Sequence, residues 1–311
     1  MNRIAFNQLL SSLSHLTNLQ KKKIVEKIEI GDVNECISLI ERHSGCDKNC
    51  PHCKSNSVSR WGQSGSLQRY RCKSCLKTFN SLTGSPLAGL HRREQWLKHS
   101  QCLIDGLSIQ KTADVCGIDP TTAFRWRHRF LTTPTLVEPK KMRGIAEVDE
   151  IFFTESSKGN KALTQRKPRK RGKNNHKNRH MRVPVLLALD RNGTIADFVF
   201  KTIDNESIKS CLRPLMSKEV ILCTDGNLIY RTFAQEEGLE HKRLVGVSGI
   251  RVIDEIFHIQ NLNAYVSRLR QWMSRFKGVS TKYLSNYLGW RRLLEGENES
   301  MNSRKCLLAT L

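Results

Sequence analysis

The chain contains no long apolar run and few acidic residues. No stretch approaches the roughly 18–20 consecutive apolar residues needed to span a bilayer, and no apolar segment typical of a signal peptide follows Met1. Only 29 Asp and Glu stand against 52 Lys and Arg, so the 311 residues carry a formal charge of +23. This charge favours a polyanionic partner, with nucleic acid ahead of a membrane surface.

The cysteines do not follow the spacing of a disulfide framework. Seven of the eleven are scattered along the chain: Cys36, Cys46, Cys102, Cys116, Cys211, Cys223 and Cys306. Reduced thiols of this kind indicate the cytoplasm.

The other four cysteines form two close pairs. Cys50 and Cys53 are separated by 18 residues from Cys72 and Cys75. Each Cys-x-x-Cys turn brings two thiolates to one cation, and two turns complete a tetrahedral zinc site. Chance pairing and a redox function are the alternatives that this spacing disfavours. Cys46 and His52 are substitute ligands that fit the spacing less well, and the polar loop between the pairs is expected to carry a hairpin.

Residues 92–131 have the pattern of a helix-turn-helix. An amphipathic helix ends at Gly117, and a basic helix follows the capping residues at 119–121. Arg125, Arg127 and Arg129 of this second helix are predicted to face DNA. An ordinary helical hairpin is the alternative, which the basic charge and the adjacent cysteine pairs disfavour. Residues 132–139 are expected to form a linker.

From residue 144 the pattern changes to strands. Strands are expected over 145–153, 183–189, 194–202 and 219–224, with helices over 207–216, 230–237 and 256–276. Strands followed by alternating helices indicate an α/β fold, a mixed sheet covered by helices.

A basic stretch separates the first two strands. Residues 158–182 hold eleven Lys or Arg, two His and no acid. Such a run is either a solubilising insertion or an arm that contacts DNA, and Lys170 and Arg171 represent the second interpretation.

Two aspartates stand out by position. Asp149 lies within the first strand, and Asp225 directly follows an apolar strand. A carboxylate in a buried strand is costly without an ion pair or a bound cation. Together the two acids form an oxygen site suited to Mg²⁺ and to phosphoryl transfer. A strand-end cap or turn is the structural alternative for each aspartate alone.

The order of these features resembles insertion-sequence transposases of the IS1595 family, also called ISXO2-like. The resemblance covers about residues 46–292, and its most specific part begins at His258. The blocks that carry it are Glu147 to Glu150, Cys223 to Gly226, Phe257 to Tyr265, Arg268 to Arg270, Phe276 to Val279 and Tyr283 to Leu288.

The resemblance implies an RNase H-like catalytic core that cuts and joins DNA with Mg²⁺ or Mn²⁺. Asp149 and Asp225 match the first two catalytic positions. The third falls on Asn263, where many members of the family have Glu; a shift of the alignment would select Asn261 instead, and Glu255 is the nearest substitute acid. His258 is expected either to contact the scissile phosphate or to cap the following helix.

The resemblance thus gives a domain order and a function. The expected domains are a helical appendage (1–45), a zinc ribbon (46–80), a helix-turn-helix region (81–135), the catalytic domain (136–295, with the insertion 158–182) and a tail (296–311). The expected function is a prokaryotic, nucleoid-associated transposase that binds its element ends and target DNA and assembles on DNA as a homo-oligomer. A non-catalytic DNA-binding regulator is the alternative, and divalent-metal-dependent cleavage separates the two.

Overall fold

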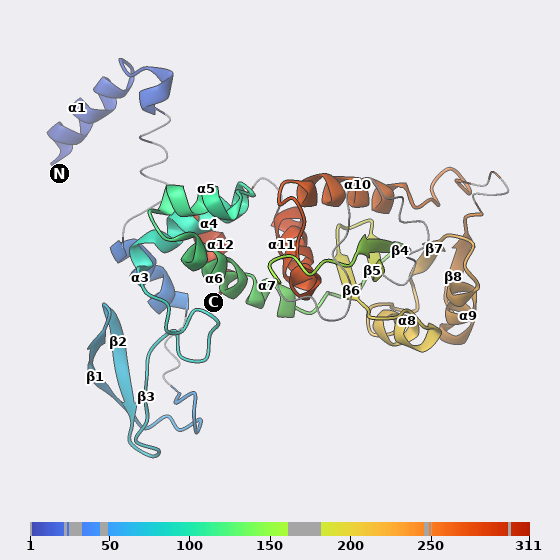
Figure 1. Cartoon of the computed structure of the whole chain (residues 1–311), viewed down its shortest axis with the longest axis horizontal. Coiled ribbons are helices and arrows are strands. Elements are labelled where there is room, and N and C mark those ends of the chain that lie inside the picture. Colours follow the sequence, from blue (N-terminus) through green and yellow to red (C-terminus); the bar gives the residue numbers. More distant parts are fainter. Residues whose placement is uncertain are drawn as a thin grey trace. The chain divides into compact units, whose positions relative to one another are not determined.

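The computed structural model of the chain forms two compact units (Figure 1). It describes residues 2–21, 24, 33–43, 49–160, 182–245, 249, 251–297 and 300–311. Lys170 and Arg171, the predicted DNA arm, and Cys46 lie outside the described residues. No helix of the described part is both long enough and apolar enough to cross a membrane.

The first unit comprises Met1–Phe130 and Ser300–Leu311. It holds a small three-stranded sheet and a group of helices. The elements are α1 (Arg3–Leu13), α3 (Val33–His43), β1 (Val58–Ser64), β2 (Leu67–Cys72), β3 (Thr78–Phe79), η1 (Arg93–Gln95), α4 (Trp96–Ile104), α5 (Ile109–Cys116), α6 (Pro120–Phe130) and α12 (Ser303–Leu308).

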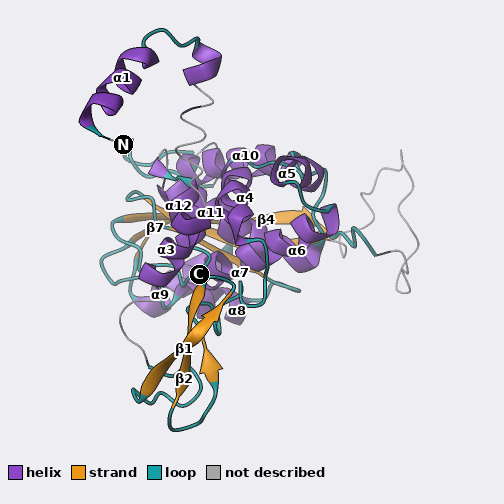
Figure 2. Cartoon of the chain, turned by 90° about the vertical axis from the view of Figure 1, so that its left-hand side faces the viewer, coloured by secondary structure: helices purple, strands orange, loops and turns teal. Residues whose placement is uncertain are grey.

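The expected hairpin lies between the two cysteine pairs (Figure 2). Strands β1 and β2 pair antiparallel, and the two residues between them, Gly65 and Ser66, both have positive φ. Two left-handed residues make the type I′ turn that matches the twist of paired strands. Strand β3 adds to β2 and brings Phe79 onto Tyr70, so the cysteine pairs share a small apolar cluster.

The helix-turn-helix is confirmed in helices α5 and α6. The Ser108 hydroxyl caps α5, and Gly117 ends it in the left-handed conformation. Asp119 then accepts a hydrogen bond from the Thr121 N–H (2.7 Å) at the start of α6. Buried aromatic side chains of α4 and α6, Trp96, Trp126 and Phe130, form the core beneath them.

The two ends of the chain contribute differently to this unit. Helix α1 buries no residue, whereas α3 buries Cys36 and Ile40. Residues 303–308, expected to be a tail, form helix α12, which packs against α4 and α3 and buries Cys306 and Leu307.

The second unit, Leu131–Glu299, is the mixed α/β domain that the strand pattern predicts. Its five-stranded sheet has the order β6-β5-β4-β7-β8. Strands β5 and β6 are antiparallel to their neighbours, and β7 and β8 run parallel to β4. The strands are β4 (Ile145–Thr154), β5 (Arg182–Asp190), β6 (Ile195–Val199), β7 (Ile221–Thr224) and β8 (Glu240–Arg243).

Helices cover both faces of this sheet (Figure 1). Helices α8 (Asn205–Leu212) and α9 (Leu228–Glu237) bury Ile208, Tyr230 and Phe233 against Val148 and Leu222. On the other face, α10 (Gln260–Ser274) packs on β4 and β5 with Leu262, Tyr265, Val266, Leu269 and Trp272. Because side chains alternate along a strand, Val148 faces α8 and α9, and Asp149 faces α10.

Two expected boundaries are wrong. Residues 132–136 form helix α7 (Thr132–Leu136) rather than a linker, because α7 packs closely on α11 (Leu284–Glu297). At Gly289 of α11, an added Cβ would lie 2.9 Å from the Thr135 Cα, so the contact needs glycine. Helix α10 starts at Gln260 and not near Ile256, because a tight turn with positive φ at Asp254 and Glu255 precedes it.

Candidate functional site

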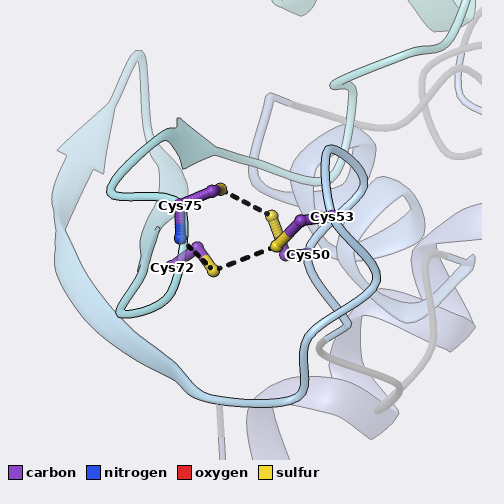
Figure 3. Close-up of side chains that lie close together, drawn as sticks. All are labelled: Cys50, Cys53, Cys72 and Cys75. Carbon is purple, nitrogen blue, oxygen red and sulfur yellow. Dashed lines mark hydrogen bonds between the residues drawn. The ribbon is translucent and has the colours of Figure 1, made fainter.

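The four paired cysteines converge on one point (Figure 3). Their sulfur atoms all lie within 4.8 Å of one another, and Cys50 to Cys75 and Cys53 to Cys72 are each 3.6 Å apart. Four thiolates around zinc at about 2.3 Å place sulfurs about 3.8 Å apart, so the cluster has the dimensions of such a site. His52 is exposed and lies outside the cluster.

The backbone around the cluster favours thiolates. The Cys75 N–H donates to the Cys72 sulfur (3.5 Å) and lowers the pKa of that thiol to about 6, whereas burial and the neighbouring thiols raise the pKa of Cys53. Because thiolates are the metal-binding form of cysteine, the cluster is prepared to hold a soft divalent cation.

The three arginines of helix α6 do not share one role. Arg125 is exposed, as predicted. Arg127 is 1% exposed, and its guanidinium donates to the Leu107 carbonyl (2.6 Å) and the Thr112 hydroxyl (3.1 Å). The prediction that Arg127 faces DNA is therefore wrong, because its charge is used to join α6 to α5.

Arg129 also differs from the prediction. Its guanidinium donates to the carbonyl groups of Pro86 and Ala88, the latter at 2.7 Å. The side chain is half-buried and ties α6 to the segment that follows the cysteine cluster. Of the three, Arg125 alone projects from the helix as expected of a residue that reads DNA.

Asp149 lies on β4, and Asp225 directly follows β7, the neighbouring parallel strand. The last paired residues of β4 and β7 are Val148 and Thr224. One residue further along this register, Asp149 stands beside Asp225, and neighbouring strands are about 4.8 Å apart. The carboxylates thus leave the same edge of the sheet, on the face that α10 covers.

The charges of the two acids influence one another. Burial raises the pKa of Asp149 to about 6, and the negative charge of Asp225 adds to the rise. The Glu150 N–H, which donates to Asp149 Oδ1 (2.8 Å), and the charge of Arg270 act in the opposite direction. Among the described residues, neither aspartate forms an ion pair with a basic side chain.

The loop after β7 fixes Asp225. Its Oδ1 accepts the Asn227 N–H (3.0 Å), and Asn227 in turn caps helix α9. Arg243 of β8 donates twice to the Gly226 carbonyl, at 3.2 and 2.8 Å. The second acid is therefore held by both elements that adjoin it.

The third predicted position, Asn263, lies in the first turn of α10 and is exposed. Residues seven apart share a flank of a helix, to within about 20°. Asn263 thus shares its flank with Arg270, whose charge lowers the pKa of Asp149. Arg270 also lines a cavity of about 420 Å³ with Phe153 and Thr154, beyond Asp149 on β4.

The alternative position, Asn261, lies on the opposite flank. It shares that flank with Arg268, whose guanidinium pairs with Glu295 of α11 at 2.5 Å. The Asn263 side of α10 is therefore the side that carries Arg270, and the Asn261 side is the one that carries Arg268 and its ion pair with α11. Glu255, the substitute acid, is exposed in the turn before α10.

His258 caps helix α10. Its Nδ1 accepts the N–H of Gln260, the first helical residue, at 3.2 Å. The ring also lies 3.6 Å from the Glu147 carboxylate and 3.3 Å from the Arg191 guanidinium.

Sequence reasoning missed Glu147 and Arg191 as members of this region. Glu147 lies two residues before Asp149, so the two acids share a face of β4. That spacing, in a strand whose neighbours Ala146 and Val148 are apolar, was the available signal. Nothing in the local pattern around Arg191 indicates its role, because the contact joins distant segments.

The comparisons with known proteins agree with these two units. Residues 92–133 match the family model of a homeodomain-like domain. Residues 141–291 match that of the ISXO2-like transposase domain. The chain is also 26% identical, over 246 residues, to an uncharacterized protein in transposable element ISH50 of Halobacterium salinarum. This match covers 77% of this chain and 82% of the relative.

Solved structures give only a faint likeness. A pre-cleavage Mos1 transpososome and a Mos1 transposase paired-end complex with the left transposon end each match at 12% identity. Each match covers 68% of this chain and 77% of that chain, with a TM-score of 0.22. A score this low carries no weight for the fold.

The matches to a homeodomain-like domain and to a transposase domain identify the transposase class of proteins. Within that class, residues 141–291 match the ISXO2-like, or IS1595, transposase domain, and this match confirms the sequence resemblance.

Proposed function

We propose that this chain is a DNA transposase that binds the ends of its insertion sequence and carries out metal-dependent strand cleavage and strand transfer. The observation that carries the proposal is the pair Asp149 and Asp225. Two acids at neighbouring positions of parallel strands, without an ion pair among the described residues, would be stabilised by a hard cation.

The proposed catalytic set is Asp149, Asp225 and Asn263, in an RNase H-like core. The two carboxylates hold the cation, and the Asn263 amide oxygen adds a neutral ligand from α10. Bound Mg²⁺ or Mn²⁺ would supply activation of the attacking hydroxyl and stabilisation of the leaving oxygen. The mixed sheet, with helices on both faces, is the architecture that the family resemblance implies.

The first unit would recognise the element ends. The cysteine cluster would hold zinc and thereby fold the ribbon, and helix α6 would enter the major groove with Arg125 toward the bases. Lys170 and Arg171 remain a predicted contact to the DNA backbone, and assembly as a homo-oligomer on DNA remains part of the proposal.

The test is cleavage of the chain's own element ends. Full-length, zinc-loaded protein is incubated with labelled duplexes that carry the DNA flanking its coding sequence, with Mg²⁺, Mn²⁺ or chelator. Nicked strands are then mapped on denaturing gels. We expect metal-dependent nicks at one position per end.

Variants assign the cleavage to the proposed site. Asp149→Ala and Asp225→Ala should abolish nicking and keep end binding nearly intact. Glu219→Ala removes an exposed acid before β7 and should nick like the wild type. End binding without nicking in the wild type would favour the non-catalytic regulator, and loss of binding in both Asp variants would overturn the catalytic assignment.

A further inference from the structure

A buried carboxylate, Glu147, lies beside the proposed catalytic set without belonging to it. Its side chain is 1% exposed, and it stands two residues before Asp149 on the same face of β4. Burial raises the pKa of Glu147. A buried charge is costly unless it is paired and hydrogen-bonded, so its partners explain why it is tolerated.

Two segments contact this carboxylate, and the His258 ring lies beside it. Glu147 Oε2 accepts the Leu262 N–H of α10 at 2.8 Å. Glu147 Oε1 lies 3.0 Å from an Arg191 guanidinium nitrogen and 3.6 Å from His258 Nδ1. The same Arg191 nitrogen donates to the Ile256 carbonyl at 3.0 Å.

These contacts join the start of α10 to strand β4. The first N–H groups of a helix lack partners within the helix and carry partial positive charge, which a carboxylate satisfies. Leu262 directly precedes Asn263, and Glu147 nearly adjoins Asp149. One side chain therefore sets the distance between the strand that carries the first acid and the turn that carries the neutral ligand.

We propose that Glu147 is a positioning residue, which holds Asn263 of α10 in place to complete the cation site of Asp149 and Asp225. The proposal rests on the proposed function. Glu147 touches neither DNA nor cation; it acts by binding the Leu262 N–H, with Arg191 as its counter-charge.

The same sheet offers a matched control. Asp197 of β6 is also a buried carboxylate paired with an arginine, Arg292 of α11. Its partner Arg292 also donates to the carbonyl groups of Pro134 and Val137, whereas Glu147 binds the Leu262 N–H. Neutralising Asp197 therefore reproduces the loss of a buried ion pair without releasing Asn263.

The experiment measures Mn²⁺ affinity of the zinc-loaded full chain without DNA, by electron paramagnetic resonance of free Mn²⁺. The proteins compared are the wild type, Glu147→Gln, Asn263→Ala, their double variant, Asp197→Asn and Asp149→Ala. Glu147→Gln keeps the side-chain volume and an acceptor oxygen but removes the charge. Loss of a residue that orients a ligand typically weakens metal binding about tenfold or more.

The proposal predicts a non-additive pattern. Glu147→Gln should weaken Mn²⁺ binding about tenfold, and the double variant should bind no more weakly than the weaker single variant. Asp197→Asn should lower the melting temperature and leave Mn²⁺ affinity unchanged. Should Glu147→Gln fail to fold, Glu147→Asp serves in its place, because it keeps the charge but shortens the side chain that reaches the Leu262 N–H; it should weaken Mn²⁺ binding as well.

Other outcomes overturn the proposal in distinguishable ways. Unchanged affinity in Glu147→Gln, or additive losses in the double variant, would show that Glu147 serves stability alone. Unchanged affinity in Asn263→Ala would remove the ligand on which Glu147 is said to act. Unchanged affinity in Asp149→Ala would instead show that the proposed cation site is wrong, and the role of Glu147 with it.

Discussion

The two candidate metal sites of this chain are built in opposite ways. The cysteine cluster takes its four ligands from two short turns, and only a few apolar side chains, such as Phe79 and Tyr70, surround it. The aspartate pair takes its ligands from distant segments of a sheet whose core is large and apolar. In the first region the metal is expected to build the fold, whereas in the second the fold builds the metal site.

Removal of the metal gives the largest expected difference between the regions. Structural zinc contributes about 10–16 kcal/mol of apparent binding free energy to modules of this size. Cys72→Ser should therefore unfold the hairpin β1–β2 and weaken specific end binding, and the five-stranded sheet should stay folded. Hydrogen exchange of β2 and β5, with zinc analysis, measures both.

Cys211→Ser is the control for this prediction, since Cys211 lies on α8, outside the cluster. It should keep the wild-type zinc content. A native zinc content in Cys72→Ser would contradict the assignment of the cluster.

The stability of the two units should also respond differently to acid. His99 is fully buried between Trp126 and Phe130, and burial, with the charge of Arg127, lowers its pKa to about 3. The unfolded chain binds this proton near pH 6.5 and the folded chain does not, so stability falls as pH falls from 6.5 toward 3. Between pH 6.5 and 5 the loss is about 2 kcal/mol.

The sheet should respond in the opposite direction. Burial raises the pKa of Asp149 to about 6, so the folded state binds that proton first and the contribution of Asp149 to stability grows as the pH falls from about 6 toward 4. Hydrogen exchange of α4 and β5 at pH 6.5 and 5 compares the units. His99→Leu should remove the acid sensitivity of α4; a persistent sensitivity would show that another group causes it.

Substitutions of the sequence-specific and of the general DNA contacts should also have different effects on DNA binding. Arg125→Ala should reduce discrimination between element ends and random DNA by about 1–3 kcal/mol, if it reads a guanine. Lys170→Ala with Arg171→Ala should weaken binding to all sequences and flatten its salt dependence. Competition binding at several salt concentrations tests both, and equal behaviour of the two variants would refute the division.

The smallest effect is expected at Asn263. Asn263→Ala should raise the Mg²⁺ concentration required for cleavage, and Asn263→Glu should preserve or raise activity, because a charged oxygen binds hard cations better. Asn261→Ala is the matched control, exposed on the opposite flank of the same turn. If Asn261→Ala raised the Mg²⁺ requirement of cleavage and Asn263→Ala did not, Asn261 would be the third ligand in place of Asn263.

The sequence predicts the elements better than their contacts. Local patterns predict the helix-turn-helix, strands β4 to β7 and the cysteine cluster, because each depends on neighbouring residues. Strand β8 was missed because Glu240–Arg243 is polar and shows no apolar alternation. Its place beside β7 depends on parallel pairing with a distant segment.

The site shows the same limit. Asp149 and Asp225 stand out because a carboxylate in an apolar strand is unusual. The buried state of Arg127 depends on the Leu107 carbonyl, and the role of Glu147 depends on the Leu262 N–H. Neither contact leaves a periodic pattern, so residue type alone favoured DNA binding for the first and gave no role to the second.

The most direct test of the central claim is the position of Mn²⁺ in crystals of the zinc-loaded protein. We predict an anomalous difference peak between Asp149 and Asp225, roughly 2.1 Å from an oxygen of each, the distance typical of Mg²⁺. This peak should disappear in Asp225→Ala, and the zinc peak among the four cysteines should remain. Mn²⁺ bound elsewhere, or aspartate carboxylates directed away from each other, would contradict the claim that this pair is the catalytic metal site.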